Sequence, residues 1–461
     1  MRLTFDDMAQ HLGLSTRAQG IVLNKVVTDS RDVTPGSLFV CIPGNRVDGH
    51  DFVQAAIAGG ASALLASRFL PGVGIPTLCV QDTVKALGEI ALLWRRQTKA
   101  KIVGVTGTAG KTTVKDVLAK TLAVHGKTAK SPVNNNNQIG MPRAILATDG
   151  DEQFWVMEVG ISHAGDMDEL ARTLQPDIGL ILNVGTGHTQ GLGEMGVAWH
   201  KASLLRHLSP SGMGLVCADY PDLVREARNT GVVLRFFSAE DRNIPYHASY
   251  VGPSTKVQGY GIYSVCLHGC CHDVTAPFMG HYGAENVAAV ASCAHILGLT
   301  AEEIISGLAQ ASLPVQRFRE ICVGSWLCID DTYNANPLSM RRMLDAAAER
   351  ASGRPLVVVL GEMLELGTRT ASEHEALGRY LAHIKPISVF WKGGQADAVR
   401  SGLVAGGYAG EWMLVEDVAH FVRAWEACFS VESTGGVVLF KGSRSNHMET
   451  LLQAVFHREQ A

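Results

Sequence analysis

The chain has 461 residues, of which 46% are hydrophobic and 18% are charged, the composition of a folded protein with more than one core. Its formal net charge of −4 argues against a nucleic-acid-binding protein, which usually carries a strong excess of basic residues. No apolar run reaches the ~20 residues of a membrane span. The start MRLTFDDMAQ lacks the pattern of a signal peptide, so we expect a cytoplasmic protein without membrane partners.

The predicted elements fall into three groups along the chain. Residues 1–99 combine short β-rich runs with turn signals and a helical pattern near 82–97. Residues 100–314 alternate strand runs, such as IVGV, FWVMEVG and MGLVCA, with helical patterns, which predicts βαβ units around a mostly parallel sheet. From residue 315 a second alternation runs from WLCIDD to GVVLFKGS. The sequence therefore predicts an α/β protein with three domains: 1–99, 100–314 and 315–461.

The stretch KIVGVTGTAGKTT at 101–113 has the strand, loop and helix start of a phosphate-binding loop. Val105 occupies the position of the first glycine of the full pattern. Lys111 can still reach the β- and γ-phosphates, and the Thr112 hydroxyl can ligate Mg²⁺. A glycine-rich turn that merely precedes a helix is the alternative. We interpret the stretch as a shortened ATP-binding loop, with expected contacts from Gly107, Thr108, Ala109, Gly110, Lys111, Thr112 and Thr113.

Two polar residues follow predicted strands, at the edge where open α/β sheets bind ligands. Glu158 ends the strand FWVMEVG, where an unpaired buried carboxylate would be costly. We therefore predict that Glu158 binds a cation, because Mg²⁺ prefers oxygen ligands. His188 follows the next strand in NVGTGH. A lone histidine at a strand end is more often a satisfied polar residue than a ligand, so the pattern alone leaves its role open.

Three of the ten cysteines cluster at Cys266, Cys270 and Cys271, beside His268 and His272. Cysteine and histidine together suit zinc, so a metal site is one alternative. The second cysteine pair of a typical zinc site is absent, and adjacent cysteines give poor tetrahedral geometry. We therefore favour reduced, structural thiols throughout the chain.

Motifs spread from end to end make the chain resemble the ATP-dependent Mur ligases. They include TDSRDVTPGSLFVCIPGNRVDGHDFVQAAIAGGASALL (28–65), GVTGTAGKTT (104–113), NNNNQIGMP (134–142), MEVGISHAGDMDELA (157–171), DIGLILNVGTGH (177–188), DDTYNANPLSM (330–340), LGEMLELG (360–367) and LFKGSRSNHME (439–449). The early DSR…DGHDF run, YNANP and KGSR are similar to the branch of the family that joins D-alanyl-D-alanine to UDP-N-acetylmuramoyl-tripeptide.

The resemblance implies a fold and a reaction. The first domain would bind the UDP end of the precursor, the central phosphate-loop domain would hold ATP and two Mg²⁺ ions, and a dinucleotide-fold-like C-terminal domain would close over the site. ATP would phosphorylate the terminal carboxylate of the peptide. The dipeptide amine would then attack the acyl phosphate to give an amide, ADP and phosphate. We expect a monomer that acts at the last cytoplasmic step of peptidoglycan precursor synthesis.

The resemblance also assigns roles to individual residues. One Mg²⁺ would be held by Thr112 and Glu158, and the second by His188 and a carbamylated Lys201. A carbamate supplies anionic oxygen, whereas a plain ammonium could not approach a metal ion. Without the family, Lys201 would be interpreted as a solvated surface lysine. The expected catalytic residues are Lys111, Lys201, His188 and Arg317.

Further contacts follow from the same resemblance. Arg317 would reach the phosphates after closure, although neighbouring Arg319 leaves the register open. Gly283 stands where the family commonly has asparagine, so the adenine contact is expected to be weaker or made by backbone. The later ATP contacts would be Asn286, Arg317 and Asp331. The expected substrate-binding residues are Ser30, Arg31, Asp48, Gly49, His50, Asn134, Asn136, Asn137, Asn334 and Asn336, of which the last two shape their loop or touch the acyl end.

Two other functions remain open. Sister enzymes include ligases that add the third residue, which carry an Asp-Asn-Pro-Arg motif absent here, and folylpolyglutamate synthetases, which lack the DSR…DGHDF segment. A non-catalytic ATP-binding switch protein is the alternative from another class. ATP turnover that requires both peptide substrates would exclude the switch protein.

Overall fold

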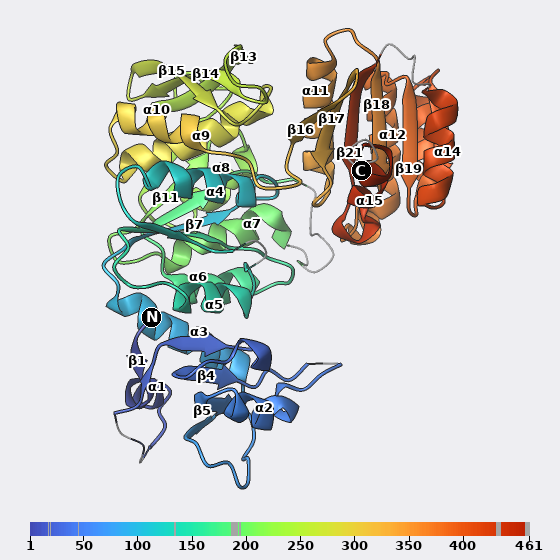
Figure 1. The fold of residues 1–461 in the computed structure, drawn as a ribbon. Coiled ribbons are helices and arrows are strands. Elements are labelled where there is room, and N and C mark those ends of the chain that lie inside the picture. The colour runs from blue at the N-terminus through green and yellow to red at the C-terminus, as the bar shows by residue number, and fades with distance from the viewer. Residues whose placement is uncertain are drawn as a thin grey trace.

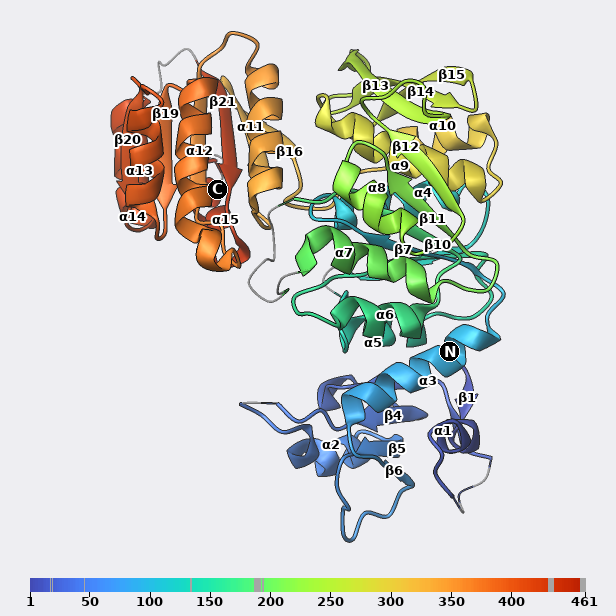
Figure 2. The same cartoon turned by 180° about the vertical axis from the view of Figure 1, so that it is seen from behind.

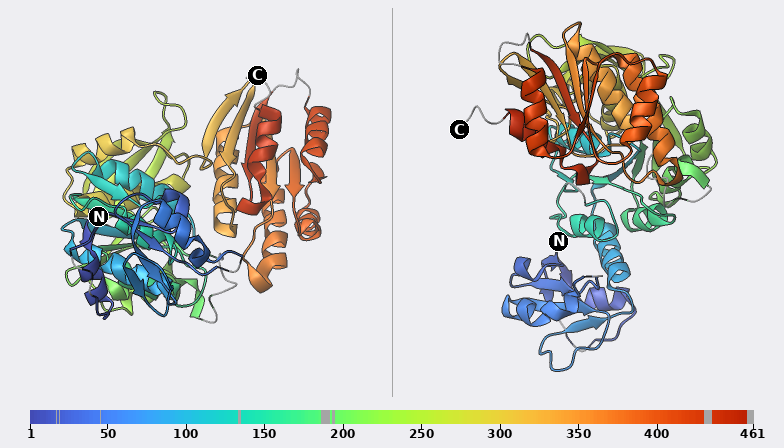
Figure 3. Two further views of the ribbon diagram at one scale, coloured as in Figure 1. Left: turned by 60° about the horizontal axis from the view of Figure 1, so that its bottom comes forward. Right: turned by 90° about the vertical axis from the view of Figure 1, so that its right-hand side faces the viewer.

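The computed structural model describes residues 1–16, 18, 20–44, 46–132, 135–185, 192, 195–429 and 435–456. It confirms a three-domain α/β fold, in which the central domain lies between the first domain and the C-terminal domain (Figure 1). The view from behind and the two turned views show the first and last domains attached to different sides of the central one (Figures 2 and 3). Among the described residues, no helix combines the length and apolar character needed to cross a bilayer.

The first domain contains a parallel sheet of order β3-β4-β5-β6 and a separate antiparallel pair, β1-β2. Helix α3 begins where the Asp82 carboxylate accepts hydrogen bonds from the backbone of Val84 and Lys85. Its apolar side joins one core that continues from this domain into the central one. The elements are β1 (Leu3–Thr4), α1 (Phe5–His11), β2 (Val22–Leu23), β3 (Lys25–Val27), η1 (Ser30–Asp32), β4 (Ser37–Val40), η2 (Gly49–Phe52), α2 (Val53–Ala58), β5 (Ala61–Ala66), β6 (Thr77–Cys79) and α3 (Thr83–Gln97).

The central domain is built on a nine-stranded sheet of order β15-β14-β13-β12-β11-β10-β7-β9-β8. The pairs from β8 to β13 are parallel, and β13, β14 and β15 are antiparallel. Side chains alternate between the two faces, so Ile102 joins the core with α5 and α6, whereas Val103 joins the core with α4 and α9. Both faces are therefore buried around the carboxyl ends of β7, β9 and β10.

The elements of the central domain are β7 (Lys101–Thr106), α4 (Lys111–Leu122), β8 (Thr128–Lys130), α5 (Gly140–Leu146), β9 (Phe154–Glu158), α6 (Asp166–Leu174), β10 (Ile178–Ile181), α7 (Gly196–Ala202), η5 (Ser203–His207), β11 (Met213–Cys217), α8 (Pro221–Arg228), β12 (Leu234–Ser238), β13 (Tyr246–Pro253), β14 (Gly261–Leu267), β15 (Cys270–Ala276), α9 (Tyr282–Ile296) and α10 (Ala301–Gln310).

The C-terminal domain has a six-stranded sheet of order β16-β17-β21-β18-β19-β20, in which only β16 is antiparallel. Helix α11 starts with a capping box between Asn336 and Ser339, and Pro337 takes its first position. The elements are β16 (Arg319–Val323), β17 (Trp326–Asp331), α11 (Pro337–Ala351), β18 (Leu356–Gly361), η6 (Gly367–Arg369), α12 (Thr370–Ile384), β19 (Ser388–Lys392), α13 (Ala396–Ala405), β20 (Glu411–Val415), α14 (Val418–Cys428), β21 (Gly436–Lys441), η7 (Arg444–Asn446) and α15 (Met448–Phe456).

The cysteine cluster differs from the expectation of reduced thiols. Cys266 and Cys271 lie directly opposite each other in the β14–β15 hairpin and form a disulfide. The expectation is therefore wrong at this pair, because the hairpin register brings the two sulfurs together. A ring nitrogen of His247 lies within 4.8 Å of both sulfurs. Sulfurs bound to each other are not thiolate ligands, so the zinc alternative gains no support, and Cys270 is free and exposed.

Candidate active site

The loop between β7 and α4 forms one wall of the site. Gly110 has a φ of +82°, a left-handed conformation that favours glycine, and it is the N-cap of α4. Lys111 opens the helix, and its Nζ donates hydrogen bonds to the carbonyl oxygens of Gly107 at 2.8 Å and Thr108 at 3.4 Å. A helix N-terminus and a lysine therefore lie side by side, which is the arrangement that binds phosphate groups.

Val105 lies inside β7, in register with Leu180 and Glu158 on the neighbouring strands, and it is fully buried. The strand continues through this position, so the turn begins only at Gly107. A Cβ atom added to Gly107 would come within 3.0 Å of the Leu182 side chain. The loop is thus shortened where the first glycine of the full pattern is missing, yet it retains its helix N-terminus and its lysine.

The Glu158 carboxylate lies beside the start of α4 and is 4% exposed. Its Oε2 accepts a hydrogen bond from the Thr112 hydroxyl at 2.7 Å, and its Oε1 accepts one from the Asn136 amide at 2.9 Å. A buried carboxylate and a hydroxyl at this position supply the hard oxygen donors that Mg²⁺ prefers, so these residues fit the ion. His188 and Asn134 lie outside the described residues.

Lys201 lies on α7 and lines the same cavity as Lys111 and Glu158. It is 2% exposed, so the interpretation as a solvated surface lysine is wrong. Burial lowers the pKa of Lys201 well below its usual value, Lys111 lowers it further, and Glu158 opposes both. Burial also lowers the pKa of Lys111. A neutral amine is the form that adds carbon dioxide, so the chemistry of this pocket fits a carbamate on Lys201.

These groups line a cavity of about 410 Å³ between the central and C-terminal domains. Arg317 enters it from the interdomain linker, with its guanidinium carbon 4.1 Å from the centre of the Tyr333 ring. Arg319 is instead the exposed first residue of β16, so the arginine at the cavity is Arg317. Other expected residues on the cavity wall are Thr108, Ala109, Gly110, Thr112, Thr113, Asn136, Asn137, Asn334 and Asn336.

A smaller cavity of about 60 Å³ shares Gly110 and Arg317 with the larger one and contains Asn286 and Asp331. The side-chain oxygen of Asn286 is buried and has no hydrogen-bond partner among the residues that the structure describes. A buried oxygen without a donor is costly, which fits a bound group that would supply one. Asp331 accepts a hydrogen bond from the Phe318 backbone at 3.1 Å.

Gly283 lies in the first turn of α9 and has no room for a side chain. A Cβ atom there would come within 2.2 Å of the Tyr263 hydroxyl and 2.7 Å of the Phe278 side chain. The Tyr263 hydroxyl is itself held by the carbonyl oxygen of Gly280 at 3.2 Å. Tyrosine therefore occupies the space that an asparagine side chain would need, and Asn286 remains the asparagine of this helix at the cavity.

The asparagines expected to bind substrate also shape the site. Asn137 accepts a hydrogen bond from the backbone of Gly140 at 2.8 Å. The Asn336 side chain caps α11 and donates to the carbonyl oxygen of Thr108 at 3.2 Å, across the domain boundary. The Asn334 side chain accepts from the next backbone N–H group at 2.9 Å. Asn334 and Asn336 therefore hold parts of their own loop in the structure, and their role toward the substrate stays a prediction.

The first domain has its own cavity of about 470 Å³, lined by Ser30, Arg31 and Gly49. A Cβ atom on Gly49 would come within 2.6 Å of the Ile42 backbone nitrogen, so only glycine fits this close approach. The Arg31 guanidinium is exposed and hydrogen-bonded to Asp29, 2.9 Å from Nε to Oδ1. An exposed cation at a cavity suits an anionic ligand such as a diphosphate.

Asp48 and His50 do not line that cavity. His50 Nδ1 contacts Asp48 Oδ1 at 2.6 Å, and His50 Nε2 accepts from the Ser67 backbone at 3.0 Å. The other Asp48 oxygen accepts from Arg68 at 2.9 Å. In the structure these two residues therefore tie the loop that carries Gly49 to the end of β5, which is an indirect role that sequence reasoning did not anticipate.

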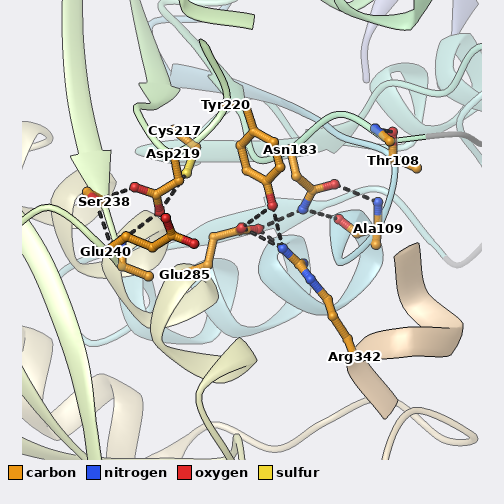
Figure 4. Close-up of polar contacts among 12 residues, drawn as sticks. Thr108, Ala109, Asn183, Cys217, Asp219, Tyr220, Ser238, Glu240, Glu285 and Arg342 are labelled. Carbon is orange, nitrogen blue, oxygen red and sulfur yellow. Dashed lines mark hydrogen bonds and ion pairs between the residues drawn. The ribbon is translucent and has the colours of Figure 1, made fainter. Parts of the chain in front are cut away.

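Sequence reasoning missed several polar residues beside the site. Lys441 ends the last strand, is 1% exposed and forms an ion pair with Asp331. A charged residue at the end of an apolar strand run is the signal that selected Glu158, and the same rule could have found Lys441. The other missed residues are Asn183, Glu285 and Arg342. Their hydrogen bonds connect the phosphate loop to α11 (Figure 4). Contacts of that kind leave no local sequence signal.

Comparison with known proteins agrees with this geometry. Family models described as "Mur ligase family, catalytic domain", "Mur ligase middle domain" and "Mur ligase, glutamate ligase domain" match residues 23–95, 105–294 and 315–444. The UDP-N-acetylmuramoyl-tripeptide–D-alanyl-D-alanine ligase of Escherichia coli (strain K12) is 31% identical over 98% of both chains. This chain therefore belongs to the Mur ligase family.

A further relative and two solved structures to which the chain is similar come from one branch of this family. The Bacillus subtilis (strain 168) protein of the same name is 28% identical over 94% of this chain and 93% of its own. A crystal structure of MurF from Acinetobacter baumannii superposes with a TM-score of 0.89 at 28% identity, over 99% of both chains. MurF from Thermotoga maritima, solved in complex with ADP, has a TM-score of 0.83 at 26% identity, over 96% of this chain and 100% of its own.

Proposed function

We propose that this protein is an ATP-dependent ligase that joins D-alanyl-D-alanine to UDP-N-acetylmuramoyl-tripeptide. The similarity of the whole chain to ligases of that name carries the proposal. The central cavity supports it, because Lys111, Glu158, Lys201 and Arg317 from two domains line one space. The activity would complete the peptide of a peptidoglycan precursor in the cytoplasm.

In this proposal each domain has its own role in the reaction. Residues 1–99 would bind the UDP end of the precursor, with Ser30, Arg31 and Gly49 at the cavity. Residues 100–314 would hold ATP on the phosphate loop, and residues 315–461 would close over it. Asn286 and Asp331 would face the nucleoside, and Asn136, Asn137, Asn334 and Asn336 would face the peptide. Asp48 and His50 would support the first cavity through the loop that they hold.

The site also suggests how the chain promotes phosphoryl transfer. A carboxylate that approaches a phosphate must overcome the repulsion of like charges. When bound, Mg²⁺ would supply positive charge at the phosphates, held by Thr112, Glu158, His188 and the carbamate of Lys201. Lys111 would stabilise charge that develops on the transferred group. Arg317 would add a cation from the linker, so domain closure would complete the site.

The experiment is an acceptor screen that measures ADP release with the purified protein. We expect turnover with UDP-N-acetylmuramoyl-tripeptide together with D-alanyl-D-alanine, and little with D-alanine, lysine or diaminopimelate. A dipeptide site loses binding energy when half of the ligand is missing, and the charged carboxylate of a single residue would lack its partner. Faster turnover with a single amino acid and UDP-N-acetylmuramoyl-dipeptide would contradict the proposal in favour of the sister ligase.

A further inference from the structure

A row of side chains connects helix α11 of the C-terminal domain to the phosphate loop of the central domain. Figure 4 shows Arg342, Glu285 and Asn183 one after another in space, with Ala109 at the end of the row. The Arg342 guanidinium contacts Glu285 through Nη2 at 2.6 Å and Nη1 at 3.2 Å. Glu285 in turn accepts a hydrogen bond from the Asn183 amide at 2.7 Å. The row crosses the domain boundary between Arg342 and Glu285.

Asn183 holds the phosphate loop at both backbone polar groups of one residue, Ala109. Its Oδ1 accepts from the Ala109 backbone N–H group at 2.8 Å, and its Nδ2 donates to the Ala109 carbonyl oxygen at 3.1 Å. The Asn183 backbone oxygen also accepts from the Thr108 N–H group at 3.1 Å. These contacts fix the two residues that precede Gly110 and Lys111, so the amide of Asn183 sets the shape of the loop.

Glu285 and the Ala109 backbone together determine which way the Asn183 amide faces. If the amide were reversed, its oxygen would meet the Glu285 carboxylate and its NH₂ group would meet the Ala109 N–H group. Both contacts would be repulsive, so the carboxylate reinforces the orientation that holds the loop. The Glu285 carboxylate is 4% exposed. An ionised carboxylate at such a position needs charge compensation.

Arg342 provides that compensation from the other domain. The two-nitrogen contact with Glu285 is the geometry that guanidinium groups make best with carboxylates. The Tyr220 hydroxyl donates to the same carboxylate at 2.7 Å, and Arg342 contacts that hydroxyl at 2.6 Å. Burial and Glu285 raise the pKa of Tyr220, which keeps the phenol a donor. Arg342 and Ala109 also line the same small cavity at the candidate nucleotide site.

We propose that Arg342 is a positioning residue through which the seated C-terminal domain holds the phosphate loop in its nucleotide-binding shape. Closure places a cation on Glu285, Glu285 orients Asn183, and Asn183 fixes Thr108 and Ala109. When the domain moves away, the buried carboxylate loses its cation and the loop loses that support. Nucleotide affinity and domain closure are therefore coupled, and by linkage each strengthens the other. The inference rests on the proposed ATP-dependent function.

The test compares Arg342→Gln with Arg341→Gln, a matched control one residue away on α11. The Arg341 guanidinium lies over the Tyr380 ring at 5.7 Å, inside the C-terminal domain. We expect Arg342→Gln to lower kcat/KM for ATP by about 5- to 150-fold, the usual range for coupling between sites, and to weaken ADP binding in calorimetry. KM for D-alanyl-D-alanine should change little, because the row ends on the phosphate loop. Arg341→Gln should resemble the wild type.

Two further variants separate positioning from folding. Arg342→Lys keeps the charge but not the paired geometry, so it should recover part of the loss. In the double variant Arg342→Gln/Glu285→Gln no buried charge is left uncompensated, so its loss should be smaller than the product of the two single losses. Wild-type behaviour of Arg342→Gln, an equal loss in Arg341→Gln, or independent losses in the double variant would each overturn the inference. Absence of ligase turnover in the wild type would instead contradict the proposed function, and the calorimetry would still test the row.

Discussion

At the scale of single residues, the site combines charged groups of both signs within one cavity. Lys111 and Arg317 bring cations, Lys201 brings a buried amine, and Glu158 brings a carboxylate whose oxygens are both hydrogen-bonded. Burial lowers the pKa of both lysines, so each depends on the neighbouring charges for its protonation state. Under the proposed function the two lysines should therefore respond differently to substitution, since Lys111 would act as a cation and Lys201 as the precursor of an anionic carbamate.

Lys111→Ala should reduce turnover by ~10²–10³-fold, the usual loss when one group that stabilises transition-state charge is removed. The fold should survive, because the hydrogen bonds that Lys111 donates to described residues go to carbonyl groups of the loop. Steady-state ADP release with both peptide substrates measures the loss. Lys120→Ala, at an exposed position of the same helix, is the control and should retain activity. Near wild-type turnover of Lys111→Ala would rule out the phosphate-loop assignment.

Lys201→Ala should also inactivate the protein, but by removing an anionic metal ligand. Formate in the buffer should then restore part of the rate, since a small carboxylate can replace the carbamate oxygens at a metal. Formate should not rescue Lys111→Ala, which lacks a cation. Mass spectrometry of the intact wild type in bicarbonate buffer should show an added carbon dioxide. Full activity of Lys201→Ala without formate would show that Lys201 has a structural role and does not supply a metal ligand.

At the scale of elements, several buried charged side chains lie at the carboxyl ends of parallel strands. Glu158 ends β9, Asp331 ends β17 and Lys441 ends β21, and each is buried with a specific partner. Sheets with both faces covered by helices leave this edge as the place where polar side chains can meet a ligand. Helix ends provide the remaining polar contacts, as at Gly110 and Asn336.

Helix α12 contains a buried histidine that should make stability depend on pH. His374 Nε2 accepts from the Met363 backbone at 3.0 Å, while Nδ1 contacts the Thr370 carbonyl oxygen at 2.6 Å, so the folded state needs the neutral ring. Burial lowers the pKa of His374 below its usual 6.5. The stabilisation is therefore complete above pH 6.5 and is lost as pH falls through the lowered folded pKa.

Urea unfolding at about pH 7.5 and about pH 5.5 should show a fall in the free energy of unfolding on the order of 1 kcal/mol from this residue. His374→Gln should be less stable at the higher pH and should show a smaller pH dependence. His383→Gln, at an exposed position of the same helix, should keep the wild-type slope. Equal slopes for His374→Gln and the wild type would show that His374 does not titrate on unfolding.

At the scale of the whole molecule, the central cavity lies between two domains that are joined by a short linker. Arg317 lies in that linker, and Gln316 and Phe318 on either side have positive φ values of 62° and 48°. Ligands bound between domains commonly draw them together. The contacts of Asn336 and Arg342 with the central domain are the ones that such a movement would make or break.

Small-angle X-ray scattering should therefore show a smaller radius of gyration with an ATP analogue and the tripeptide precursor than with the free protein. Lys111→Ala with the same ligands should compact less, since it binds the nucleotide phosphates poorly. An unchanged radius of gyration in the wild type at saturating ligand would show that closure is not part of the cycle.

The sequence by itself determined the features that rest on neighbouring residues. The strand–loop–helix around Lys111, the buried strand ending in Glu158 and the α/β alternation of the two larger domains follow from local patterns. Motif similarity added the family and Lys201, whose burial no local pattern indicates. In the first domain the same similarity selected Asp48 and His50, although the structure makes them supports of a loop.

Only the tertiary structure decided which residues meet. Strand register joined Cys266 to Cys271, and domain packing placed Arg342 on Glu285. Space filled by Tyr263 explained Gly283. Residue type and spacing specify which groups can form hydrogen bonds and ion pairs. Which of these groups become partners, however, depends on sheet register and on the packing of elements far apart in the chain. Many sequences can satisfy the same register and packing with different pairs of residues.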